Sequence, residues 1–209
     1  MKTTNTIAVT ASLFTGLLGL SGAQAATVSK SFDGNDCSGY FGQGFESCTI
    51  FVDSDGTDIE LSPVIAKFDE GLSLDEANTD LFPSIDGSEF GFSDLGDDNS
   101  TGTWTYTAGT NDPGIRYWAT KASNGFILSW EVDEIALSDG GVCDVADVFT
   151  LDCLDAAQVQ TSNSWTTPDG KELSHITFYD TAVVPVPAAV WLLGSALGGL
   201  GFMRRRKTS

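Results

Sequence analysis

Apolar and polar residues alternate through several central segments of the chain. In segment 103–107, Trp104 and Tyr106 alternate with threonines, so an extended strand would have one apolar and one polar face. The same period of two recurs in two further segments, whose apolar positions are Phe126, Leu128, Trp130 and Val132, and then Ile176 and Phe178. No long 3.6-residue period accompanies these segments between the two ends of the chain. The pattern therefore predicts β-strands in this part of the chain.

Turn-forming residues separate the predicted strands. Clusters of Gly, Asn, Asp, Ser and Pro, which favour tight turns, occur at 53–56, 86–87, 111–114, 123–125 and 168–170. Further strands are expected at 49–52, 59–61, 64–68 and 115–120, with a helical turn within 144–159. Short strands joined by such turns predict an all-β fold, an antiparallel β-sandwich, of which a jelly roll is one form.

Residues 1–25 have the three parts of a secretory signal peptide. Lys2 supplies the positive charge, residues 7–20 form an apolar run, and Ala23-Gln24-Ala25 is a small-x-small cleavage site. We expect passage through the Sec translocon and a cut by signal peptidase between Ala25 and Ala26. A permanent membrane helix is the alternative, but the apolar run is short and ends at a cleavage site.

The C-terminal segment, 183–209, has the features of a membrane anchor. Pro185 and Pro187 prevent a helix from starting before position 187. The uncharged residues 188–203 would span about 24 Å as a helix, somewhat less than the roughly 30 Å hydrocarbon core. Four cations follow directly: Arg204, Arg205, Arg206 and Lys207. Such a basic run keeps the C-terminus in the cytoplasm, so the pattern predicts a transmembrane helix with an exported domain, 26–182, on the other side.

This layout resembles the PEP-CTERM sorting signal of Gram-negative bacteria. The Val-Pro-x-Pro-Ala-Ala variant of that signal corresponds to Val184, Pro185, Val186, Pro187, Ala188 and Ala189. Val186 stands where the commonest form has Glu. The resemblance implies that an exosortase, a membrane-embedded cysteine protease, cleaves near the Pro motif, and that the protein accompanies exopolysaccharide production. Segments 104–107, 112–121 and 174–181 also resemble parts of uncharacterised PEP-CTERM proteins, which implies no activity.

The predicted exported domain is strongly acidic. The chain has 29 Asp and Glu residues, all of them within 26–182, against 10 Lys and Arg residues. Basic residues within this range are Lys30, Lys67, Arg116, Lys121 and Lys171. A field of this sign repels nucleic acids and anionic membrane surfaces. It favours cationic partners, divalent cations, or simply solubility in a saline exterior.

The four cysteines all lie in the predicted exported domain. An even number of cysteines in an oxidising compartment indicates disulfides, and four cysteines allow three pairings. We predict Cys37–Cys48 and Cys143–Cys153, because each pair closes a short loop. Each would stabilise the fold by on the order of 3 kcal/mol in the loop-entropy view. The spacings do not fit a zinc site, and the chain has one His.

One acidic segment is a candidate Ca²⁺ site. Asp53, Asp55, Asp58 and Glu60 surround Gly56 and offer the oxygen ligands that Ca²⁺ needs. The spacing is not that of an EF-hand, and an acidic hairpin turn explains the same residues. We expect no cofactor apart from this Ca²⁺.

Two tryptophans are candidates for stacking on sugars. Trp118 and Trp104 would form a platform if they lay exposed on one sheet face, whereas aromatic residues in a sandwich more often form the core. His175 lies on a predicted strand between apolar residues, where a structural hydrogen bond is the simplest role. Acidic residues are too numerous for the sequence to select a pair suited to glycoside hydrolysis.

Three functions are compatible with these observations. The first is a non-enzymatic protein of the cell surface or extracellular matrix, held transiently in the inner membrane and sorted by an exosortase. The second is a carbohydrate-binding module for exopolysaccharide, assisted by Ca²⁺. The third, a polysaccharide-active enzyme, requires a cleft with two facing carboxylates.

Overall fold

The computed structural model describes residues 25–54 and 56–180. The predicted signal peptide before Ala25, the sorting motif 184–189, the membrane helix 188–203 and the basic residues 204–207 lie outside the described residues, as does Asp55. These features remain predictions.

The described part of the chain is all-β, with ten strands and one short α-helix. The strands are β1 (Ala25–Asp33), β2 (Thr49–Ser54), β3 (Thr57–Asp69), β4 (Leu74–Ala77), β5 (Phe90–Ser93), β6 (Thr101–Tyr106), β7 (Ile115–Ala122), β8 (Gly125–Asp133), β9 (Ser162–Thr166) and β10 (His175–Asp180). The helix α1 (Leu151–Asp155) lies within the segment where a helical turn was expected. Short helical turns occupy Asp36–Tyr40, Phe45–Ser47, Asp97–Asn99, Glu134–Leu137 and Pro168–Gly170.

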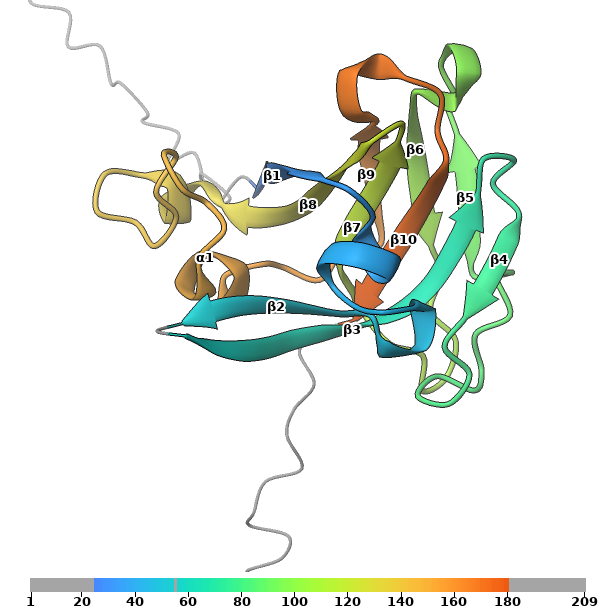
Figure 1. The fold of residues 1–209 in the computed structure, drawn as a ribbon, viewed down its shortest axis with the longest axis horizontal. Helices are drawn as coiled ribbons and strands as arrows, with labels where there is room; N and C mark the ends of the chain where they lie inside the picture. The colour runs from blue at the N-terminus through green and yellow to red at the C-terminus, as the bar shows by residue number, and fades with distance from the viewer. Residues whose placement is uncertain (1–24, 55, 181–209) are drawn as a thin grey trace, which may run out of the picture.

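Within the described residues the strands form two antiparallel sheets. The larger has the order β1-β8-β7-β10-β3-β2, with β4 also paired to β3, and the smaller has the order β5-β6-β9. The last strand, β10, lies at the centre of the larger sheet between β7 and β3. Figure 1 shows the β2–β3 hairpin extending beneath α1, away from the strands that β3 joins at its other end.

One core cluster lies between the two sheets. Trp104 of β6 packs edge-on against Trp118 of β7 and Phe178 of β10, with ring centroids 5.4 and 5.2 Å apart. Tyr106 and Ile176 are buried in the same cluster. The alternation predicted for 103–107 is therefore confirmed, because Trp104 and Tyr106 point inward whereas Thr105 is exposed.

The other face of the larger sheet carries the second core cluster. The four apolar residues predicted to share a face of β8, namely Phe126, Leu128, Trp130 and Val132, are all buried there. This face is covered by the loop around the helical turns Asp36–Tyr40 and Phe45–Ser47 and by segment 134–157, which includes α1. Both faces of the sheet are thus closed by other parts of the chain.

Strand β3 corrects one sequence prediction. The segments 59–61 and 64–68 were expected as separate strands, but they form one continuous strand of 13 residues. Pro63 lies where β3 changes partner: it is opposite Thr49 of β2, and from Val64 onward β3 pairs with β10. A proline, which has no N–H to donate, is tolerated at such a junction without ending the strand.

Candidate functional site: a buried carboxylate beside the Cys37–Cys48 disulfide

Both predicted disulfides are confirmed. Cys37 and Cys48 join the two ends of the loop that covers the larger sheet, and their Cα atoms are 4.8 Å apart. Cys143 and Cys153 join segment 134–150 to α1, with Cα atoms 4.6 Å apart. All four cysteines are buried in the same core cluster, so each disulfide fastens a covering segment to the sheet.

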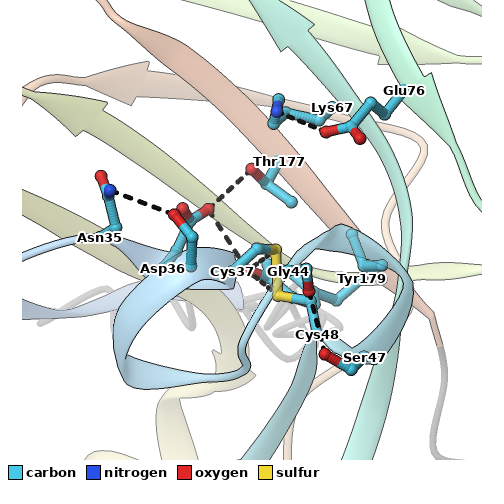
Figure 2. The surroundings of a disulfide bond; sticks show 12 residues. Asn35, Asp36, Cys37, Gly44, Ser47, Cys48, Lys67, Glu76, Thr177 and Tyr179 are labelled. Carbon is cyan, nitrogen blue, oxygen red and sulfur yellow. Dashed lines mark hydrogen bonds and ion pairs between the residues drawn. A yellow bond between two sulfur atoms is a disulfide. The ribbon is translucent and has the colours of Figure 1, made fainter.

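A buried aspartate lies next to the first disulfide. Asp36 begins the helical turn Asp36–Tyr40 and is 1% exposed. It faces β10, on which His175, Thr177 and Tyr179 share one side because side chains alternate along a strand. Figure 2 shows the Asp36 carboxylate directed at Thr177, and the disulfide lying beside Tyr179. Asp36, His175, Thr177 and Tyr179 are called here the Asp36 cluster.

The Asp36 carboxylate accepts hydrogen bonds from all three partners on β10. His175 Nε2 lies 2.8 Å from Oδ1, and Thr177 Oγ1 donates to Oδ2 at 2.7 Å. The Tyr179 hydroxyl donates to Oδ2 at 3.5 Å and also lies 3.7 and 3.6 Å from the two sulfur atoms of the disulfide. Both carboxylate oxygens are thereby satisfied in a site closed to water.

The surroundings of Asp36 favour its charged form. Burial by itself would raise the pKa of this carboxyl, but it is outweighed by the hydrogen bond and charge of His175 and by hydrogen bonds from Thr177 and the Cys37 N–H. The net effect is a pKa below the ordinary value for aspartate. Asp36 is therefore a buried carboxylate with well-placed donors, which the fold retains in ionised form.

The geometry of the Asp36 cluster does not activate a nucleophile. In a hydroxyl–imidazole–carboxylate triad, the imidazole accepts the proton of the hydroxyl. Here the Thr177 hydroxyl donates to the carboxylate, and Thr177 is 0% exposed. The arrangement instead links the disulfide loop to the central strand of the sheet, which is a structural role of the kind expected for His175.

The disulfide loop is tightly folded above this cluster. A Cβ atom on Gly42 would lie 2.8 Å from the Ser47 carbonyl oxygen and 3.0 Å from Cys48 Cα. Only glycine allows the two limbs of the loop to approach this closely. The loop is thus fixed by the disulfide, by Gly42 and by the buried carboxylate together.

No protein-family model, curated protein or solved structure matches the chain.

The predicted sugar-stacking platform is wrong. Trp118 is 1% exposed and Trp104 is 0% exposed, and both lie between the two sheets. An external sugar cannot reach either ring. Trp104 and Trp118 are core residues because the smaller sheet covers this face of the larger one.

The acidic segment proposed for Ca²⁺ forms the turn of the β2–β3 hairpin. Asp53 and Asp58 are opposite one another in the strand register, and Asp53 Oδ1 accepts a hydrogen bond of 2.7 Å from the Gly56 N–H. Glu60 is opposite Phe51, two positions further from the turn. In the part of the chain that the structure describes, no three His, Cys, Asp or Glu side chains gather in a way that could hold a metal ion. The Ca²⁺ site remains a prediction.

Two further predictions are a membrane-spanning helix and a signal-peptidase cut between Ala25 and Ala26. No helix among residues 25–54 and 56–180 has the length and apolar character needed to cross a membrane. Ala25 and Ala26 are the first two residues of β1, where Ala26 pairs with Val132. A cut between them would remove one residue from the strand and leave the other pairs of β1 intact.

Only part of the Asp36 cluster is indicated by the sequence pattern. The run from His175 to Tyr179 alternates polar and apolar positions, which marks a face of the strand able to make hydrogen bonds. Asp36, however, is 139 residues away from His175 and is one of 29 acidic residues. Its position next to Cys37 was the available signal, because a disulfide brings its neighbours into the core.

Tyrosine ionisation provides a test of this interior. Burial raises the pKa of Tyr117 to about 12. Burial and nearby acidic groups together raise the pKa values of Tyr106 and Tyr179 well above the ordinary value. Partial burial also raises the pKa of Tyr40. The chain has four tyrosines. We expect less tyrosinate absorbance near pH 10 in the folded protein than in the unfolded chain, with most of it appearing at higher pH. Because these groups bind protons more tightly when folded, their contribution to stability is complete below pH 10 and is lost as the pH rises through the folded-state pKa values.

The measurement is an ultraviolet titration followed in parallel by circular dichroism. The same titration in denaturant supplies the control, in which all tyrosines should ionise near pH 10. Ionisation of the tyrosines near pH 10 with the fold intact would show that they are solvated.

Proposed function

We propose that this protein is an exported, non-enzymatic component of the bacterial cell surface or extracellular matrix, delivered by the Sec pathway and sorted by an exosortase. The observation that supports it most strongly is the pair of disulfides in the all-β body. Disulfides form and persist in oxidising compartments and are rare in the cytosol. Export therefore accounts for the cysteines and for the apolar segments at the two ends with one hypothesis.

The arrangement of the body fits this delivery. Strand β1 begins at the expected signal-peptidase cut, and β10 ends at Asp180, close before the Val184 motif. Both cuts would then leave the sheet whole apart from the Ala25–Asp133 pair. A sandwich-like body with an acidic surface would remain soluble after release, since like charges keep copies apart. The jelly-roll form of the sandwich remains a prediction.

A structural role is favoured by how the body uses its reactive groups. The one His and the buried Asp36 are paired with each other, and the four cysteines are joined in disulfides. These groups stabilise the fold, whereas an enzyme would direct such groups at a substrate. We propose that the protein acts within the exopolysaccharide of the extracellular matrix.

Carbohydrate binding is the second candidate function, favoured by one specific observation. A hollow beside the disulfide loop is lined by the partly exposed rings of Tyr40 and Phe51 together with Asp58 and Glu60. Aromatic rings beside polar side chains are the usual lining of sugar sites.

Neutralising the basic tail tests the sorting hypothesis. With Arg204→Gln, Arg205→Gln, Arg206→Gln and Lys207→Gln combined, we expect loss of membrane retention and of C-terminal processing, because the stop signal is removed. Cell fractionation and the intact mass of the exported protein report both effects. The matched control replaces the three arginines with lysine and should be processed normally. Unchanged location and C-terminal mass in the neutral variant would refute the proposal.

A further inference from the structure

The hollow beside the disulfide loop has an aromatic wall. It has a volume of about 290 Å³ and lies between the turn that contains Tyr40 and the hairpin formed by β2 and β3. Tyr40 is 41% exposed, whereas Phe41, which also lines the hollow, is 2% exposed. The rings of Tyr40 and Phe51 are nearly parallel, with an angle of 9° between their planes and centroids 6.1 Å apart. The hollow therefore offers flat apolar surface to solvent.

The aromatic wall is held rigidly. The Tyr40 ring contacts four further aromatic rings, those of Phe32, Phe41, Phe126 and Phe149. A ligand that stacks here has little side-chain freedom to remove, which favours binding.

Carboxylates line another side of the hollow. Asp58 and Glu60 are exposed and lie two residues apart on β3, so both side chains are on the same face of the hairpin. Phe51 is on this face as well, because it is opposite Glu60. The ion pairs within the described residues leave both carboxylates without a basic partner. The neutral polar side chains of the lining are Gln43, Ser47 and Thr49. The hollow is thus negative as well as apolar, and its charge calls for a cationic ligand.

We propose that this hollow binds a sugar bearing a free amino group, with one face of the ring on Tyr40 and Phe51 and its ammonium group near Asp58 and Glu60. The inference deepens the carbohydrate-binding candidate by naming the class of sugar. Parallel rings fit a flat, ring-shaped ligand better than a lysine side chain. Uronic acids are repelled by the two carboxylates, and N-acetylated sugars have no charge for them to attract.

The test is calorimetric titration of the mature exported protein with a short glucosamine oligomer at low salt. We expect binding that weakens as salt is added, and much weaker binding of the fully N-acetylated oligomer. Replacing Asp58→Asn and Glu60→Gln together should weaken binding by about fivefold to tenfold, as for two exposed charge contacts. Tyr40→Ala should weaken it by about tenfold through lost stacking.

The matched control changes two acids in a hollow that has no aromatic wall. Glu70 and Glu172 line such a hollow with Leu173 and Ser174. The combined Glu70→Gln and Glu172→Gln variant loses the same charge and should bind like the unaltered protein. Circular dichroism of every variant confirms that it is folded.

Several outcomes would overturn the inference. These are no binding, equal binding of the acetylated oligomer, or an equal loss in the two double variants. Oligolysine that binds as tightly and depends on Asp58 and Glu60 would identify a cationic peptide as the partner. Each of these results leaves the sorting proposal intact, because that proposal is decided by location and C-terminal mass.

Discussion

Replacing Asp36 with alanine is expected to lower the free energy of unfolding by about 3–5 kcal/mol, since it leaves the donors of a buried charged network unpaired. His175 and Thr177 lose a partner at 2.8 and 2.7 Å, and Thr177, which is 0% exposed, cannot turn to water instead. Urea denaturation measures the change, with an unaltered m-value expected if the unfolded state is unaffected. Asp139→Ala, at an exposed position, is the control and should change stability by less than about 0.5 kcal/mol.

The pH dependence of the Asp36 contribution follows from its depressed pKa. A carboxyl with a lower pKa in the folded state stabilises the protein above its unfolded-state pKa, near 4, and the contribution disappears as the pH falls through the folded-state value. The stability curves of the unaltered protein and Asp36→Asn should therefore converge in acid. A gap that stays constant down to the lowest pH at which the protein folds would show that the charge of Asp36 has no part in stability.

Removing the Cys37–Cys48 disulfide is the second large change. The Cys37→Ala and Cys48→Ala double variant should lose about 3 kcal/mol from the greater freedom of the unfolded chain. We expect a further loss of about 1–2 kcal/mol, because Asp36 is held against β10 by the loop that this disulfide closes.

The other disulfide supplies a matched control. Cys143 and Cys153 are 10 residues apart, against 11 for Cys37 and Cys48, so the loop-entropy contributions are nearly equal. The Cys143→Ala and Cys153→Ala variant should lose only about 3 kcal/mol. Denaturation of both variants, each with and without Asp36→Ala, separates the loop-entropy contribution from the contribution of the Asp36 hydrogen bonds. Equal losses in the two variants, with Asp36→Ala fully additive in both, would show that the loop and the carboxylate act independently.

The strands most visible in the sequence are those with one buried face. Phe126 to Val132 and Trp104 to Tyr106 keep a period of two, interrupted only at Ile127, because one side of each strand enters a core. Strand β9 was missed because Trp165 is its one buried residue. Strand β1 escapes the pattern because it lies at the edge of the sheet, where Val28 alone is fully buried and Phe32 only in part. Local pattern thus predicts a strand in proportion to how much of it the fold covers.

The site was harder to predict than the fold, for a physical reason. The disulfides follow from loop length, which the sequence states directly. The exposure of an aromatic residue depends on whether a second sheet covers it: Trp104 and Trp118 are covered, whereas Tyr40 is not. Nothing local distinguishes these cases, since the covering strands come from distant parts of the chain. Likewise, Asp36 is distinguished from the other acidic residues only by its hydrogen bonds to β10, a strand that is distant in the sequence.

The position of β10 has a consequence for delivery. A polypeptide threaded across a membrane from its N-terminus releases β1 first and β10 last, yet β10 lies between β7 and β3. Until it emerges, those two strands have no common neighbour and the halves of the sheet end in open edges. Under the proposed export, the larger sheet would therefore stay incomplete for nearly the whole passage. It would close only when little more than segment 181–209 is still to cross, so the order of translocation would set the time of folding.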